Sequence, residues 1–377
     1  MTEPAYPAAR AVARRIQDHF ANHVLAARNA GHDHVAAPPD ADAVEAIIDA
    51  AFWASLRREE GALPKISLAY LSPADAGHTL TFAQRLPLRP SALARLAPAV
   101  ERPGIHLGVW RENGELTVWG TTRAIPAFGL VVEVVDSGLL VIKHRVDPFG
   151  KFVNVAVLEG DQIKIIDEGF SLTPDCPGPV KSLLGVDTMM TFGTVDVVVQ
   201  IAASMRLHGR GGTLLVVSAS HDDWRQSIVE PMLYGVTPPF SELAELIRRE
   251  PDESDHHDWQ DDLRRAVDAV AGLTAVDGAT IMTDRYELLA FGAKIARRRG
   301  HAQVERVVLT EPVEGAAVDV TTPAQLGGTR HFSAAQFVHD QRGATALVAS
   351  QDGRFTIFKW SQADELVHAH RVEALLL

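Results

Sequence analysis

The sequence predicts a protein of mixed helix and strand, of the α/β (α+β) class, built from two parts. The chain has 377 residues, more than one small hydrophobic core normally organises. Apolar residues recur at every fourth position near the start, then at every second position, and the second half alternates helix and strand patterns. We expect a helical start plus an antiparallel β-rich domain over 1–175, and a mixed β-sheet flanked by helices over 190–377. The proline-rich stretch 173–179 separates them.

The first sixty residues are rich in alanine and predict helices. Val12, Ile16, Phe20 and Val24 are four apart and mark one apolar helix face. A second helix is expected over Asp42–Arg58.

The middle of the chain predicts short strands separated by turn residues such as Asn113-Gly114. Four polar residues near strand ends could bind a ligand, although such residues are more often simply exposed on the surface. They are Arg123, His144, Arg145 and Asp147. The expected strands are Lys65–Leu71, Thr79–Phe82, Gly104–Trp110, Glu115–Trp119, Gly129–Val135, Leu139–Lys143, Phe152–Leu158 and Gln162–Ile166.

The last half of the chain predicts helices and strands in alternation, as in a sheet covered by helices. The expected helices are Val195–Leu207, Ser241–Arg249, Trp259–Val270 and one that begins near Arg330. The expected strands are Thr213–Val217, Ala279–Met282, Glu287–Phe291, Arg306–Leu309 and the hairpin Ala344–Ala349 with Arg354–Lys359.

Composition excludes several classes of protein. Lys and Arg number 36 against 48 Asp and Glu, a net charge of −12, which argues against a protein that coats nucleic acid or an anionic membrane. Cys176 is the single cysteine, so neither an internal disulfide nor a cysteine zinc finger is expected. The most apolar stretches contain acidic residues, and the start has no apolar signal-peptide core. We therefore expect a cytoplasmic protein.

The most informative segment runs from Gly327 to His331 and opens a helix. Thr329 is a suitable N-cap, which places the basic side chains of Arg330 and His331 in the first helical turn. The helix dipole disfavours cations at that end, and a bound anion would reverse the cost. Free backbone N–H groups, a Gly-Gly pair and an arginine together predict a phosphate cradle. An ordinary capped surface helix is the alternative.

A second segment, Asp277-Gly278-Ala279, stands at the mouth of a predicted strand. A carboxylate at this place could hold Mg²⁺ or Mn²⁺ against phosphate oxygens. A plain Asp-Gly turn is the alternative. The basic run Lys294 and Arg297–Arg299 follows, and it is either a triphosphate contact or, more often in proteins, a solvated face.

These segments occur in an order that matches a known family. They are GGTLLVV at 211–217, DGA at 277–279, GTRHFSAA at 328–335 and ATALVASQDGRFTIF at 344–358. Over about residues 192–360 the chain resembles the catalytic domain of diadenylate cyclases, the N-terminal domain type of the DNA-integrity scanning protein. The N-terminal half resembles, more faintly, the DACNV-like sensor domains found ahead of such cyclase domains.

The resemblance implies a nucleotidyltransferase that condenses two ATP molecules into cyclic di-AMP with the help of Mg²⁺ or Mn²⁺, under the control of the sensor domain. Because one site would hold one ATP, it also implies a homodimer or higher homo-oligomer. The resemblance assigns catalysis to Asp277, Arg330 and His331, nucleotide binding to Gly278, Ala279, Gly328, Thr329 and Ser350, and the metal to Asp277 and Asp352.

The chain departs from the family pattern in ways that favour an alternative. Phe332 replaces the second arginine of Arg-His-Arg, and Gln351 stands in the hairpin segment where the family is acidic. A catalytically degenerate protein that binds a nucleotide and only senses it is therefore the second hypothesis, and a protein-contact scaffold is the third. Two runs, His32-Asp33-His34 and Asp255–Asp258, could bind metal, but solvated loops are expected there.

Overall fold

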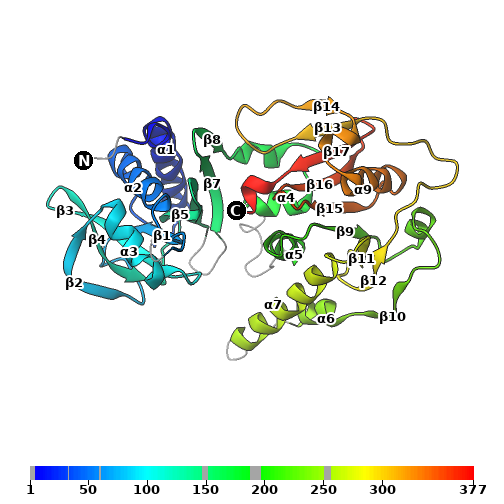
Figure 1. Cartoon of the computed structure of the whole chain (residues 1–377), viewed down its shortest axis with the longest axis horizontal. Helices are drawn as coiled ribbons and strands as arrows, with labels where there is room; N and C mark the ends of the chain where they lie inside the picture. The colour runs from blue at the N-terminus through cyan, green and yellow to red at the C-terminus, as the bar shows by residue number, and fades with distance from the viewer. Residues whose placement is uncertain (1–4, 33, 59–60, 147–151, 187–196, 250–255) are drawn as a thin grey trace. The chain divides into compact units, whose positions relative to one another are not determined.

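The computed structural model of the chain describes residues 5–32, 34–58, 61–146, 152–186, 197–249 and 256–377. The chain divides into two compact units. The N-terminal unit is Met1–Ile166 together with Leu377, and the C-terminal unit is Asp167–Leu376. Each unit has a β-sheet with helices packed on it, which is the expected α+β class (Figure 1).

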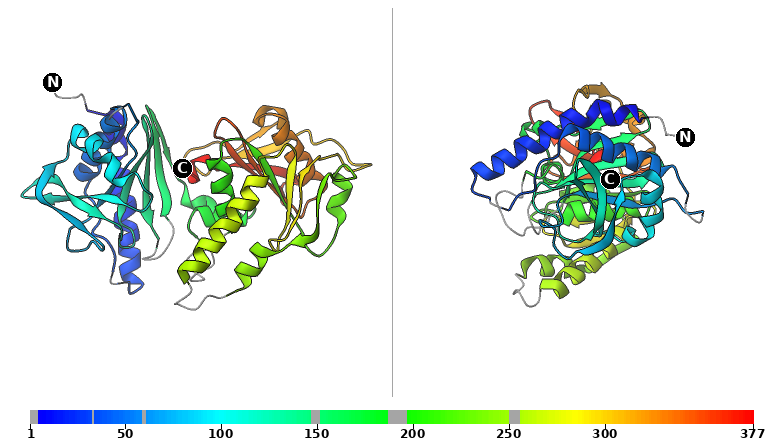
Figure 2. Two further views of the ribbon diagram at one scale, coloured as in Figure 1. Left: turned by 60° about the horizontal axis from the view of Figure 1, so that its bottom comes forward. Right: turned by 90° about the vertical axis from the view of Figure 1, so that its left-hand side faces the viewer.

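Two helices begin the N-terminal unit, α1 (Pro7–Asn29) and α2 (Ala41–Ser55). The expected apolar stripe of α1 is buried at all four of its positions. The Asp40 carboxylate caps α2 by accepting a 2.7 Å hydrogen bond from the Ala43 N–H. Because α2 packs on the sheet and α1 packs on α2, the two helices lie over one face of the strands (Figure 2).

The sheet of this unit has the strand order β2-β4-β3-β1-β5-β6-β7-β8. Its neighbours are antiparallel, as expected, except that β1 and β3 run parallel. An unexpected helix, α3 (Pro90–Val100), lies in the connection between them, and such a crossover lets neighbouring strands run in the same direction. The strands are β1 (Ile66–Tyr70), β2 (Leu80–Pro87), β3 (His106–Glu112), β4 (Glu115–Thr122), β5 (Leu130–Asp136), β6 (Leu139–Arg145), β7 (Phe152–Glu159) and β8 (Gln162–Ile165).

A buried histidine should make this unit sensitive to acid. Burial, with smaller contributions from the Lys143 and Arg145 charges, lowers the pKa of His106 to about 4, and its Nδ1 lies 2.7 Å from the Ser67 Oγ. Between about pH 6.5 and pH 4 the unfolded chain binds a proton that the folded chain rejects, so stability falls as the pH drops through that window. We expect His106 to cost about 2 kcal/mol of unfolding free energy on going from pH 7 to pH 5.

Urea denaturation of the full chain at the two pH values measures this loss. His106→Asn keeps a polar partner for Ser67 but cannot titrate, so the variant should lose less stability on acidification. Equal losses in the variant and the wild type would show that His106 is not responsible.

The C-terminal unit has a sheet with the order β10-β12-β11-β9-β15-β16-β17-β13-β14. Its strands are β9 (Gly212–Val217), β10 (Tyr234–Phe240), β11 (Ala279–Thr283), β12 (Leu288–Ala293), β13 (Val307–Thr310), β14 (Asp319–Thr321), β15 (Thr345–Ala349), β16 (Phe355–Ser361) and β17 (Leu366–Arg371). Its described α-helices are α4 (Gly178–Leu183), α5 (Val197–Leu207), α6 (Glu242–Arg248), α7 (His256–Leu273), α8 (Pro323–Leu326) and α9 (Thr329–Asp340).

Helices cover both faces of this sheet. Phe337 and Val338 of α9 share a buried cluster with Ala346 and Val348 of β15. Because side chains alternate along a strand, Leu347 points to the other face, where α5 packs against β15 (Figure 1). The mixed sheet flanked by helices is thus as expected.

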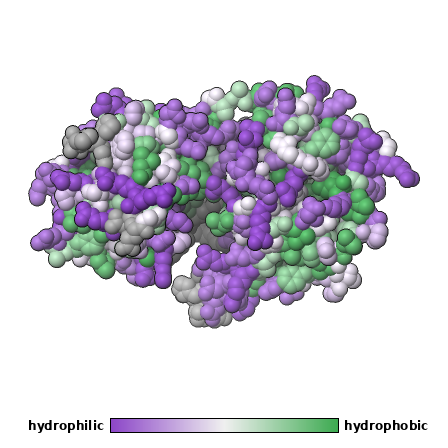
Figure 3. Space-filling model, viewed as in Figure 1, coloured by the Kyte–Doolittle hydropathy of each residue, from purple (hydrophilic) through white to green (hydrophobic). Residues whose placement is uncertain are grey.

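The surface is mostly hydrophilic on the face that Figure 3 shows. Hydrophobic residues gather at its lower right, over the region where β10 and β12 lie in Figure 1. No helix in the described ranges is long and apolar enough to cross a membrane.

Candidate functional site

A pocket of about 510 Å³ opens at one end of the C-terminal sheet. This volume is within the range of small-molecule sites, about 300–1,000 Å³. Eight of the nine predicted site residues line the pocket, and Asp352 is the exception. The lining residues are Thr213, Asp277, Gly278, Ala279, Ala293, Lys294, Ile295, Gly328, Thr329, Arg330, His331, Ser333, Val348, Ala349 and Ser350.

Strand register explains why segments far apart in the sequence meet here. The β9 and β11 strands are parallel neighbours, so both begin at the pocket end of the sheet. The antiparallel strands β12 and β15 end there, with Ala293 opposite Ala279 and Val348 opposite Thr213. The α9 helix begins at the same place, because Thr329 and Arg330 in its first turn line the same pocket.

Asp277 presents its carboxylate to solvent at the pocket, with 87% of the side chain exposed. The Lys294 ammonium lies 2.5 Å from its Oδ2, and this hydrogen bond is the main reason why the pKa of Asp277 lies below its usual value. The charges of Lys294 and Arg330 act in the same direction. Asp277 is therefore ionised at neutral pH.

Gly278 allows the backbone to turn into β11 beside β12. Its φ is +115°, and a Cβ atom there would lie 2.5 Å from the Gly292 carbonyl carbon. No larger residue fits such an approach without displacing the strand end. The glycine thus fixes the position of Asp277 relative to Lys294.

Arg330 is the cation of the first turn of α9. Gly211, with a φ of +71°, lies beside it, and a Cβ atom at Gly211 would come within 3.0 Å of the Arg330 Nη1. The glycine therefore leaves room for the guanidinium next to the start of β9. No acidic residue occupies the first turn of α9, so its N–H groups and Arg330 face a position suited to an anion.

The helix start differs from the expectation at two residues. Gly328, not Thr329, is the N-cap, so the N-cap residue has no side chain with which to cap the helix. His331 is only 2% exposed, and its Nε2 lies 3.4 Å from the Thr356 Oγ1 of β16. Burial is the main cause that lowers the pKa of His331, so its ring is neutral at pH 7 and Arg330 alone carries the charge of this turn.

His331 holds the glycine pair in place. A Cβ atom at Gly327 would lie 2.6 Å from the His331 Nδ1, so the ring packs directly against this glycine, and its other side faces Phe358 edge-on. The ring is thus placed to position the backbone that leads into α9, and it also lines the pocket.

Asp352 lies in the turn between β15 and β16, beside the pocket and outside its lining. A hydrogen bond from the Ser350 hydroxyl is the main cause that lowers the pKa of Asp352, and the Arg354 Nε lies 3.4 Å from its Oδ2. Its carboxylate is therefore engaged by its own turn. Gln351 donates a 3.2 Å hydrogen bond to the Arg210 carbonyl, which ties this turn to the start of β9.

Sequence reasoning missed part of the site. Lys294 was grouped with a basic run that is more often a solvated face, and Thr213 and Ser333 gave no local signal. The pairing of Ala279 with Ala293 places Lys294 next to Asp277, so the register of β11 and β12 was the missing information. Of the other polar candidates, Asp33, Asp147 and Asp255 are outside the described residues, and His144 is buried in the N-terminal unit.

Comparison with known proteins adds one finding. Residues 33–123 match the family model described as "Probable sensor domain DACNV". The matched region begins before α2 and ends after β4, so it includes α2, α3 and the four strands β1 to β4 of the N-terminal unit. A search of curated proteins returned no match. The DACNV region supports a sensor domain in the N-terminal unit, as expected.

Proposed function

We propose that the C-terminal unit is a diadenylate cyclase-like nucleotidyltransferase that condenses two ATP molecules into cyclic di-AMP, and that the DACNV region regulates it. One observation carries this proposal: the Asp-Gly-Ala and Gly-Thr-Arg-His motifs, about fifty residues apart in sequence, line a single pocket. An exposed carboxylate and a guanidinium at a helix N-terminus are the groups that a metal-bound triphosphate requires.

The residues present fit a Mg²⁺ or Mn²⁺ ion in part. Mg²⁺ is commonly held by one or two carboxylates together with substrate phosphates, and Asp277 offers one ionised carboxylate at the pocket. Asp352 is engaged by Ser350 and Arg354, so we assign the ion to Asp277 first and treat Asp352 as a test case. When bound, such an ion would neutralise charge on the phosphate oxygens.

The chain's own residues would position the nucleotide. Arg330 and the backbone N–H groups at the very start of α9 bind triphosphate oxygens, while His331 keeps the Gly327–Gly328 backbone in place. The 3′-hydroxyl oxygen of one ATP forms a bond to the α-phosphorus of the other ATP as the bond from that phosphorus to the oxygen shared with the β-phosphate breaks, and pyrophosphate leaves. The hydroxyl proton passes to the Asp277 carboxylate. The step is repeated once to close the ring.

The reaction requires two copies of the chain, because one pocket supplies one nucleotide and the attacking hydroxyl belongs to the other. An exposed apolar edge near the pocket supports self-association. The β10 strand is at the sheet edge, and Leu233, Tyr234 and Phe240 are 85%, 48% and 37% exposed. Exposed apolar edge strands are common association surfaces.

A second function is favoured by a specific observation. The Lys294 ammonium forms a 2.5 Å ion pair with the Asp277 carboxylate, which a metal would also need. Phe332 stands where the resembled family has a further arginine. Both features would weaken metal-assisted turnover more than nucleotide binding. A nucleotide-binding sensor without turnover is therefore the second candidate.

Incubation of the full chain with ATP and Mg²⁺ or Mn²⁺, followed by chromatography, separates the two candidates. The cyclase forms a metal-dependent cyclic dinucleotide and pyrophosphate. The sensor binds ATP in a calorimetric titration but leaves it unchanged. A chain that neither binds nor converts ATP would contradict both.

A further inference from the structure

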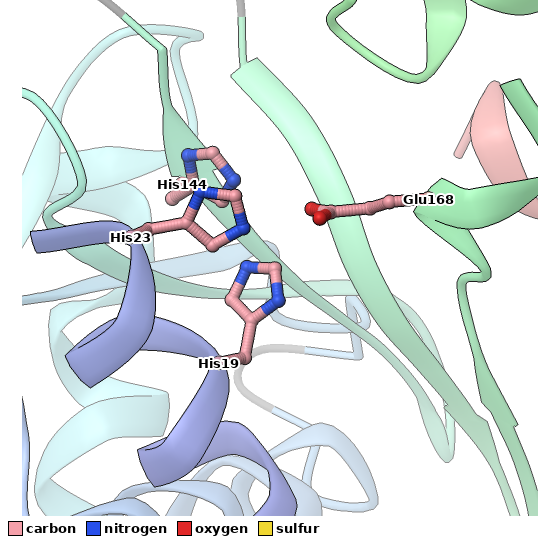
Figure 4. A group of neighbouring side chains, drawn as sticks. All are labelled: His19, His23, His144 and Glu168. Atoms are coloured by element: carbon pink, nitrogen blue, oxygen red, sulfur yellow. The ribbon is translucent and has the colours of Figure 1, made fainter. Parts of the chain in front are cut away.

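Three histidines gather in the N-terminal unit, whereas the pocket described above belongs to the C-terminal unit. His19 and His23 lie on α1, and His144 lies on β6 (Figure 4). Each offers a ring nitrogen, and these nitrogens lie within 4.8 Å of one another. We infer that His19, His23 and His144 bind one divalent transition-metal ion, Zn²⁺ in the first instance.

The spacing on α1 makes two of the ligands neighbours. His19 and His23 are four residues apart, so they share one face of the helix, and their ring centroids are 4.4 Å apart. The His144 ring lies 5.3 Å from each of them. Three imidazoles from two elements therefore converge on one point.

The distances suit a metal after a small adjustment. An equilateral triangle with 4.8 Å edges has its centre about 2.8 Å from each corner, and a Zn–N bond is about 2.0–2.1 Å long. Each ring nitrogen therefore has to move by less than about 1 Å, which rotation of the imidazoles can supply. Three histidines leave a fourth position for water or another donor group.

A hydrogen bond fixes the tautomer of His144. Its Nδ1 lies 3.2 Å from the Arg145 carbonyl oxygen, which can only accept, so Nδ1 carries the proton and Nε2 keeps its lone pair. Metal-binding histidines commonly donate their second N–H to a backbone carbonyl in this way. The Nε2 atoms of His144 and His19 are both buried.

Aromatic side chains surround the three histidines and shield them from water. This shielding, more than any nearby charge, favours a bound cation. Phe128 stacks on His23 at 5.5 Å and lies 5.2 Å from His144, and Phe20 meets the His144 ring edge-on. The cationic neighbours of His144 on β6 point away, because side chains alternate along a strand. Lys143 and Arg145 lie over the ring of Phe152 instead.

Sequence inspection placed candidate metal ligands elsewhere, at His32–His34 and Asp255–Asp258. His144 is about 120 residues from the two histidines of α1, so no spacing motif in the sequence joins the three ligands. They also lie outside the DACNV match, so the site is a feature of this chain's own N-terminal unit. It is independent of the function proposed for the C-terminal pocket.

Zinc titration of the full chain, after metal is removed with a chelator, tests the inference. Competition with a chromophoric chelator gives stoichiometry and affinity, and Co²⁺ gives a visible absorption band that reports histidine ligation. We expect one tightly bound Zn²⁺ per chain. His19→Ala and His23→Ala should each weaken that binding by about 10-fold or more, and the double variant by about 100-fold.

His34→Ala is the matched control, because this histidine is exposed in a loop and should leave zinc affinity unchanged. His19 and His23 are only partly buried, so their replacement should preserve the fold, which circular dichroism checks. Zn²⁺ should raise the melting temperature of the wild type and of His34→Ala, but not of the double variant. Wild-type zinc affinity in the double variant would overturn the inference.

Discussion

Replacing Asp277 by asparagine should reduce formation of the cyclic dinucleotide by at least about 1,000-fold, while ATP binding stays within about threefold. Asparagine has the same size but no charge, so the pocket keeps its shape and loses the carboxylate proposed to hold the metal. A catalytic metal contributes several kcal/mol of transition-state stabilisation, which corresponds to a loss of this size. Product formation is measured by chromatography, and ATP binding by calorimetry.

Asp352→Asn is the matched control for this experiment. Its carboxylate lies outside the pocket lining and interacts with Ser350 and Arg354, so we expect a loss of less than about tenfold. Two variants with equally large losses would indicate a metal site with two carboxylates. An Asp277→Asn variant with wild-type turnover would contradict the role proposed for Asp277.

Arg330→Ala should weaken ATP binding by about 10- to 100-fold, the second large effect. The guanidinium lies at the pocket beside Gly211, and a hydrogen bond between charged groups contributes about 1.5–3 kcal/mol. Because phosphate contacts are made before and during the reaction, both ATP affinity and turnover should fall. Calorimetric titration with ATP and with adenosine distinguishes a phosphate contact from a base contact, since only the ATP affinity should change.

Two further variants sharpen this test. Arg330→Lys keeps the charge but loses the planar fork, so it should restore part of the ATP affinity. Arg299→Ala removes a cation that is exposed and outside the pocket lining, and it should leave ATP affinity unchanged. If Arg330→Ala bound ATP as tightly as the wild type, α9 would not be the phosphate-binding element.

Most elements of the fold could be predicted where local patterns were strong. The stripe from Val12 to Val24 predicted α1, and alternation predicted β1 to β8, because one buried face is enough to produce a period in the sequence. Other elements were missed. The exposed strand β10 contains two prolines and has no buried face, so it carries no period-two signal.

The motifs of the candidate site could be predicted from the sequence, but the protonation states and ion pairs of its side chains could not. Asp277 and Arg330 were found from sequence, and the structure brings both to one pocket. The neutral state of His331 could not be predicted, because it depends on burial beneath Gly327 and beside β16. The ion pair of Lys294 with Asp277 likewise depends on the register of β11 and β12.

The sequence by itself determined the α+β class, the order of most elements and the residue types that could hold a phosphate. Tertiary structure alone decided which side chains meet. It made β1 and β3 parallel through the α3 crossover, it buried His331, and it brought His144 to the two histidines of α1. The physical reason is that periodicity records only whether a residue is buried, whereas proximity depends on strand register and packing between distant segments.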